Sequence, residues 1–73
     1  MTLTEAEARM LERAASYSDG LTWACTLGEQ EAVESIVYWR LGTRSPYGPN
    51  GFVITQAGRD ALAKAKEAKD EDH

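Results

Sequence analysis

Residues 38–62, YWRLGTRSPYGPNGFVITQAGRDAL, set the order of the elements in the second half of the chain. Residues 40–45 and 51–55 have the composition of two short strands, and prolines and glycines break the chain between them. Thr55 has a side chain suited to an N-cap, directly before a helical pattern. The sequence therefore predicts a helix that ends near Gly42, then a hairpin, then another helix.

Two earlier segments, residues 4–7 and 26–29, have the Ser/Thr-x-x-Glu spacing of a capping box. In this motif the hydroxyl accepts a hydrogen bond from the amide three residues on, and the carboxylate accepts one from the cap amide. The first segment predicts an amphipathic helix that ends near residues 18–20, where Gly20 suits a left-handed cap, and the second predicts a central helix. Residues 20–26 between the two helices are long enough for a short strand or one helical turn.

The central helix is predicted to continue to Gly42, a second glycine suited to a left-handed cap. Its periodicity places Arg40 at the inner edge of the last turn, where a cation is favourable. Trp23 is interpreted as a core residue, since a domain this small needs large side chains to fill its centre. The residues predicted to face inward are Ala32, Val33, Ile36, Val37 and Trp39, and those predicted to face outward are Glu31, Glu34, Ser35 and Tyr38.

The last helix has one side of small apolar residues, which require close packing. The chain is predicted to fray from about Lys69 onward. We therefore expect a single domain over residues 1–69, followed by a frayed acidic C-terminal tail over residues 70–73. The small apolar side is formed by Ala57, Gly58, Ala61, Leu62, Ala65 and Ala68.

The chain has 73 residues, which is enough for one domain with a small core. Its one cysteine, Cys25, cannot form an internal disulfide, so we expect a reducing compartment, by default the cytoplasm. No basic-then-apolar leader precedes Thr4, and no apolar run approaches the roughly 20 residues that a membrane helix needs. We expect no membrane partner.

The junction of the last strand and the last helix matches a pattern found in many winged-helix proteins, LT-x-x-G-R-x-x-L. The match is formed by Ile54-Thr55-Gln56-Ala57-Gly58-Arg59-Asp60-Ala61-Leu62. Over roughly residues 29–69 the chain resembles a winged-helix domain, although residues 20–26 stand where a standard winged helix has a full helix. The resemblance implies a reduced winged-helix-like α+β fold, mostly helical, with three helices and a two-stranded β-hairpin wing.

Catalytic chemistry is poorly supported by the residue types present. The single histidine, His73, is the last residue, and Cys25 has no local base and no metal-ligand spacing. Glu29, Glu31 and Glu34 lack a basic or histidine partner for acid–base work. We therefore expect a protein that is not an enzyme and needs no cofactor or metal, with Cys25 interpreted as a small buried apolar residue.

The charge balance favours a protein partner with a basic surface. The formal net charge of −4 argues against a ligand held mainly by neutralising its phosphates. Tyrosine concentrates binding energy at interfaces. We therefore predict a protein-binding module that uses Glu31, Glu34, Ser35 and Tyr38 of the central helix, together with Tyr47 at the hairpin tip unless that ring folds back over the hairpin. A short, acidic, non-catalytic chain of this kind resembles the small inhibitors of phages and mobile elements, including anti-CRISPR proteins, which block basic nucleic-acid-binding surfaces.

The winged-helix resemblance implies an alternative function, that of a DNA-binding transcriptional regulator. Under this alternative the central helix enters a major groove, and Arg40, Arg44 and Lys64 contact the DNA. A homodimer would bring both copies of Arg44 to one surface. However, Arg40 is equally explained as a cation at a helix C-terminus, Arg44 as a charge on an edge strand, and the acidic face would meet phosphate. We therefore favour protein binding.

Overall fold

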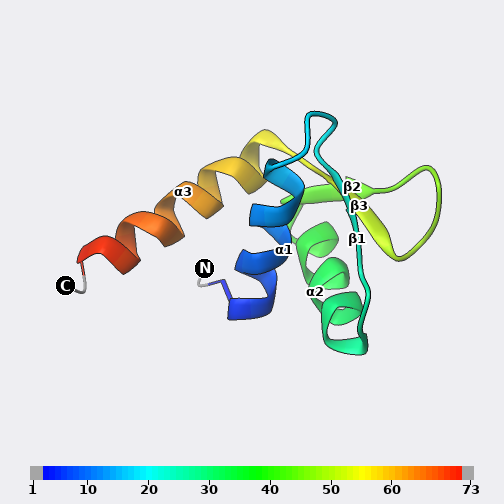
Figure 1. Cartoon of the computed structure of the whole chain (residues 1–73), viewed down its shortest axis with the longest axis horizontal. Coiled ribbons are helices and arrows are strands. Elements are labelled where there is room, and N and C mark those ends of the chain that lie inside the picture. The colour runs from blue at the N-terminus through cyan, green and yellow to red at the C-terminus, as the bar shows by residue number, and fades with distance from the viewer. Residues whose placement is uncertain (1–2, 72–73) are drawn as a thin grey trace.

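The computed structural model describes residues 3–71, which form three helices and a three-stranded antiparallel sheet. The predicted α+β, mostly helical fold is confirmed. Helices α1 and α2 pack against each other and against the sheet, and α3 contacts α1 and leads away from the sheet (Figure 1). In chain order the elements are α1 (Glu5–Ala15), β1 (Leu21–Trp23), α2 (Leu27–Tyr38), β2 (Gly42–Arg44), β3 (Gly51–Ile54) and α3 (Gln56–Glu71).

The sheet has one strand more than the predicted hairpin. Its order is β1-β3-β2, because residues 21–23 pair with β3 on the side away from β2. The open question about residues 20–26 is therefore settled as a strand. Gly20 has the predicted left-handed backbone, with φ of 70°, but it leads into β1 and does not cap α1, which ends earlier at Ala15. A Cβ on Gly20 would lie 2.9 Å from Cγ2 of Ile54, so the close approach of the two segments also requires glycine.

Alternation along the strands gives the sheet a buried face and an open face. Thr22 and Phe52 lie opposite each other in the register and are both buried against the helices. Leu21 and Val53 form the next pair on the open face and are only half-buried. The buried hydrophobic residues are Met10, Leu11, Ala14, Ala32, Val33, Ile36, Leu41, Phe52, Ile54 and Leu62.

The prediction that both tryptophans belong to the core is wrong. Trp23 is 42% exposed and Trp39 is 55% exposed. Trp23 shares the open face of the sheet because it lies two residues from Leu21 on the same strand. Trp39 lies just beyond the last residue of α2, so it no longer follows the helical periodicity that placed it inward. Phe52 and Met10 are the largest side chains that fill the centre instead.

Helix α2 ends at Tyr38, four residues before the predicted cap at Gly42. The amide of Leu41 donates to the carbonyl of Ile36 (2.9 Å) and the amide of Arg40 donates to that of Val37 (3.1 Å), which is the hydrogen-bond pattern of a Schellman motif. The left-handed residue of this motif is Arg40, with φ of 61°, so Arg40 lies outside the helix and not on the inner edge of its last turn. Gly42 belongs to β2, where a Cβ would lie 2.5 Å from Cδ2 of Phe52.

The first turns of α3 fit closely against the preceding strand and the end of α2. Thr55 is the predicted N-cap, since its Oγ1 accepts a hydrogen bond from the amide of Gly58 (3.1 Å) and donates one to the carbonyl of Arg40 (2.9 Å). A Cβ on Gly58 would collide with the carbonyl oxygen of Leu41. On the predicted apolar side Gly58 and Leu62 are buried, whereas Ala57 is exposed.

The helix continues to Glu71, two residues past the predicted point of fraying at Lys69. Residues 72–73 of the predicted tail, and the side chain of Ala68, lie outside what the structure describes.

Replacing Arg40 with glycine should raise the free energy of unfolding by about 1 kcal/mol, because a left-handed conformation costs a residue with a Cβ roughly 1–2 kcal/mol. Thermal unfolding should show a midpoint higher by about 4–8 °C. Arg40→Ala is the matched control: it removes the charge and keeps the Cβ, so it should bring no gain. An equal gain in both variants would show that the charge, and not the backbone, is unfavourable.

Gly58→Ala should lower the free energy of unfolding by about 1–3 kcal/mol, since the added methyl group has no space against the Leu41 carbonyl. Gly28→Ala is the control within a helix, because a Cβ there meets only Oγ1 of Thr26, at 3.9 Å. That variant should be neutral or up to about 1 kcal/mol more stable. Urea denaturation of both variants measures the difference, and equal behaviour would contradict the close approach of α3.

Candidate interaction surface

Helix α2 presents one line of exposed side chains along its whole length, which we call the α2 stripe. It consists of Leu27, Glu31, Glu34 and Tyr38, whose spacings of four, three and four residues place them on one side of a helix. Leu27 is 79% exposed and Tyr38 is 71% exposed, at the two ends of a stripe about 16 Å long. The predicted outward positions of Glu31, Glu34 and Tyr38 are confirmed, whereas Leu27 was missed.

The two glutamates of the stripe differ in their ionic contacts. Oε2 of Glu34 lies 2.7 Å from Nη2 of Arg44 on β2, and both side chains are about half exposed. This hydrogen bond, and then the charge of Arg44, lower the pKa of Glu34. The same contact raises the pKa of Arg44. The structure thus pairs a residue predicted to bind protein with one predicted to bind DNA, while Glu31 forms no ion pair among residues 3–71.

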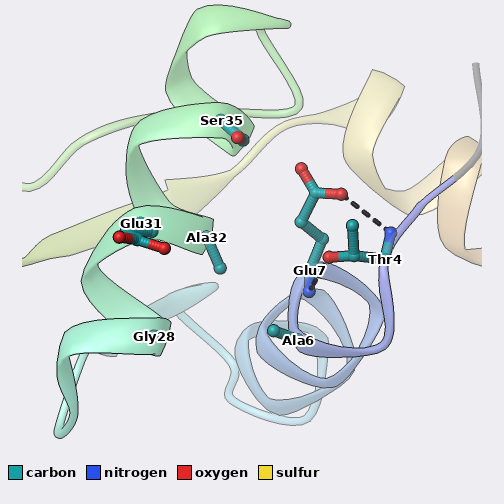
Figure 2. Close-up of a pocket in the computed structure, with 7 residues that line it drawn as sticks. All are labelled: Thr4, Ala6, Glu7, Gly28, Glu31, Ala32 and Ser35. Carbon is teal, nitrogen blue, oxygen red and sulfur yellow. Dashed lines mark hydrogen bonds between the residues drawn. The ribbon is translucent and has the colours of Figure 1, made fainter.

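A groove of about 290 Å³ lies beside the stripe, between α1 and α2 (Figure 2). Ser35 lies in this groove and is half-buried. It was predicted to face outward with Glu31, Glu34 and Tyr38, but it is less exposed than they are. The opposite wall carries the predicted capping box, in which the amide of Glu7 donates to Oγ1 of Thr4 (3.1 Å) and the amide of Thr4 to Oε1 of Glu7 (2.8 Å). The lining residues are Thr4, Ala6, Glu7, Gly28, Glu31, Ala32 and Ser35.

The start of α2 is held in place by Arg13 of α1. Nη2 of Arg13 donates to Oε1 of Glu29 (3.0 Å) and to the carbonyl of Trp23 (3.2 Å). Thr26 is the predicted cap, since its Oγ1 accepts from the amide of Glu29 (3.1 Å), but the Glu29 carboxylate accepts from the amide of Cys25 (2.7 Å) instead of returning to Thr26. The hydrogen bond from Cys25, and next that from Arg13, lower the pKa of Glu29.

The remaining predicted site residues are distributed over the molecule. Tyr47 is 78% exposed and lies against Trp23, with ring centroids 6.5 Å apart, so it belongs to the open face of the sheet. Arg40 is exposed beyond the end of α2. Lys64 is exposed on α3, which leads away on the side opposite the loop of residues 45–50 (Figure 1). Lys64 and Arg44 are therefore not gathered into one basic surface.

The structure also shows the surroundings of Cys25 and of the residue types that bind metals. Cys25 is a free thiol and is exposed, so its interpretation as a buried residue is wrong. Within residues 3–71, no three histidine, cysteine, aspartate or glutamate side chains lie close enough together to hold a metal ion. Over the same range, none of the helices combines the length and the apolar character needed to cross a membrane.

Comparisons with known protein families, with curated proteins and with solved structures found no match to this chain.

Glu29→Gln should lower the free energy of unfolding at pH 7, because the native state stabilises the ionised carboxylate through Cys25 and Arg13. The lowered pKa means that this stabilisation is present above the ordinary value of 4.5 and is lost as the pH falls through the native value. The difference between the variant and the parent should therefore shrink below about pH 4.5. Urea denaturation at neutral and acidic pH tests this, with Glu67→Gln on α3 as control. A difference that does not change with pH would contradict the role of the ionised group.

Proposed function

We propose that this chain is a non-enzymatic protein-binding module whose α2 stripe docks on a basic surface of another protein. The observation that carries the proposal is the composition of the stripe: two exposed hydrophobic side chains, Leu27 and Tyr38, flank the carboxylates of Glu31 and Glu34. Exposed hydrophobic side chains at helical spacing are the anchors by which a helix binds a groove on a partner. The carboxylates between them select a partner with lysine or arginine at its centre.

The contact between Glu34 and Arg44 supports this use of the stripe. Arg44 engages Oε2 of Glu34, and a carboxylate with two oxygens can accept further hydrogen bonds through the other one. The net charge of −4 adds a long-range attraction that steers a basic partner toward the chain.

The target chemistry that fits best is a protein surface that normally holds phosphate. Such a surface carries arginine and lysine, and an acidic helix can occupy it in place of nucleic acid through the same charge complementarity. This is how small phage and mobile-element inhibitors of the anti-CRISPR type act, and we propose that role for this chain. The reducing cytoplasm is the compartment we propose for it, since that is where nucleic-acid-binding enzymes work.

The proposal is tested by capturing partners from nuclease-treated lysate of the source cells with three proteins: the parent, Glu31→Lys/Glu34→Lys, and the control Asp60→Lys/Glu67→Lys. The control makes the same change of charge on α3. We expect one protein to be captured by the parent and the control, to be lost with the α2 variant, and to be released by raising the salt. Equal capture by all three would contradict a role for the stripe.

The same preparations test DNA binding. Under the DNA-binding alternative, untreated lysate should yield DNA with the parent, and Arg44→Ala should abolish retardation of that DNA in a gel while Lys64→Ala weakens it. We expect no specific retardation by the parent, because Glu34 already pairs with Arg44. Specific retardation that depends on Arg44 would replace protein binding as the proposed function.

A further inference from the structure

Charged residues are almost absent from the three strands and from the loop between β2 and β3, although Asp19 and Arg40 lie in the connections that lead into β1 and β2. The chain carries twelve acidic and eight basic residues, yet residues 20–28 and 41–58 together contain only one of them, Arg44. That residue is paired with Glu34 at 2.7 Å. Depletion of charge together with exposed aromatic rings is the compositional signal of the centre of a protein–protein interface.

The open face of the sheet carries the exposed rings. We call this the aromatic face, and it consists of Leu21, Trp23, Tyr47 and Val53. The indole of Trp23 lies across the backbone of β3, since a Cβ on Gly51 would be 2.6 Å from Cε3 of Trp23. Tyr47 stands at its edge with an angle of 53° between the two ring planes. The patch therefore combines a flat surface, formed by the Trp23 indole, with a projecting ring, that of Tyr47.

The loop that carries Tyr47 is fastened at several points. The amide of Tyr47 donates to Oγ of Ser45 (3.0 Å), and the amide of Ser45 donates to the carbonyl of Gly51 (3.1 Å). Across the sheet, the amide of Ala24 donates to the carbonyl of Asn50 (2.7 Å). These hydrogen bonds hold the backbone of the loop in position before any partner binds, which reduces the conformational entropy lost on association.

We infer that the aromatic face is a self-association surface on which a second copy of the chain docks around a two-fold axis. A chain with a net charge of −4 repels its own copy, so two copies meet most easily through a surface without charge. Contact through the α2 stripe would instead bring the two copies of Glu31 together. In a two-fold contact both subunits use the same patch. Because the flat indole lies next to the projecting tyrosine, Tyr47 of each copy can cover Trp23 of the other.

The edge of β1 is not the site of this contact. The amide of Leu21 donates to Oδ1 of Asp19 (3.1 Å), and the carbonyl of Trp23 accepts from Arg13 (3.2 Å). These contacts occupy groups that an added strand would need, as natural proteins do to block edge-to-edge pairing. The copies therefore meet through the face of the sheet, and the α2 stripe of each copy stays available.

Sedimentation equilibrium of the purified chain over a wide range of concentration tests this inference. The parent should show a monomer–dimer equilibrium, and Trp23→Ala should raise its dissociation constant about tenfold or more, as expected for an aromatic residue at the centre of an interface. Tyr47→Ser should act in the same direction and, because Tyr47 is in an exposed loop, should leave the fold intact by circular dichroism. Trp39→Ala, which removes a comparably exposed tryptophan at the end of α2, should leave the equilibrium unchanged.

The response to salt separates this inference from the proposed function. Salt screens the repulsion between two acidic copies, so it should strengthen the dimer, whereas it should weaken capture of a basic partner. Glu31→Lys/Glu34→Lys should lose that capture and keep a dimer that Tyr47→Ser disrupts. A parent that stays monomeric at its highest soluble concentration, or a dimer that responds to Trp39→Ala and not to Trp23→Ala and Tyr47→Ser, would overturn the inference.

Discussion

The guanidinium of Arg13 connects the three elements on which the arrangement of the surface depends. From α1 it reaches the carbonyl of Trp23 at the end of β1 and the carboxylate of Glu29 in the first turn of α2. Only residues 24–26 join that strand to that helix, so these contacts hold the start of α2 close to the end of β1. The side chains of Arg13 and Glu29 are 33% and 18% exposed, so water screens their contact less than it screens the pair of Glu34 and Arg44. The α2 stripe faces outward because Ala32, Val33 and Ile36 are buried on the opposite side of the helix.

What the sequence predicts well in this chain is local. The N-caps at Thr4, Thr26 and Thr55 follow from the residue type and from the amides within three positions of it, so they could be read without the fold. The predictions that failed depend on partners distant in sequence. The third strand exists because β3 lies beside residues 21–23, and the left-handed cap falls on Arg40 because Gly42 is needed against Phe52 in the sheet.

In the candidate site too, local features could be predicted from the sequence and contacts between distant residues could not. Helical periodicity was enough to turn Glu31, Glu34 and Tyr38 outward, and extending it one turn toward the N-terminus would have found Leu27. The ion pair between Glu34 and Arg44 could not be read from the sequence, since it joins a helix to a strand ten residues on. Size predicts both tryptophans in the core, and helical periodicity predicts the same for Trp39. The strand's alternation and the end of α2 decide their exposure instead.

The pair of Glu34 and Arg44 bears on how charge is divided between the α2 stripe and the aromatic face. Glu34 belongs to the acidic stripe, and Arg44 is the one charged residue of the segments that form the sheet. Arg44 lies opposite Phe52 in the register, so its side chain is on the face of the sheet that meets the helices and not on the aromatic face. On that side of the sheet Arg44 pairs with Glu34 of α2 at 2.7 Å. The one charged residue of the strands is thus on the side of the acidic stripe, and none of the residues that form the aromatic face carries a charge.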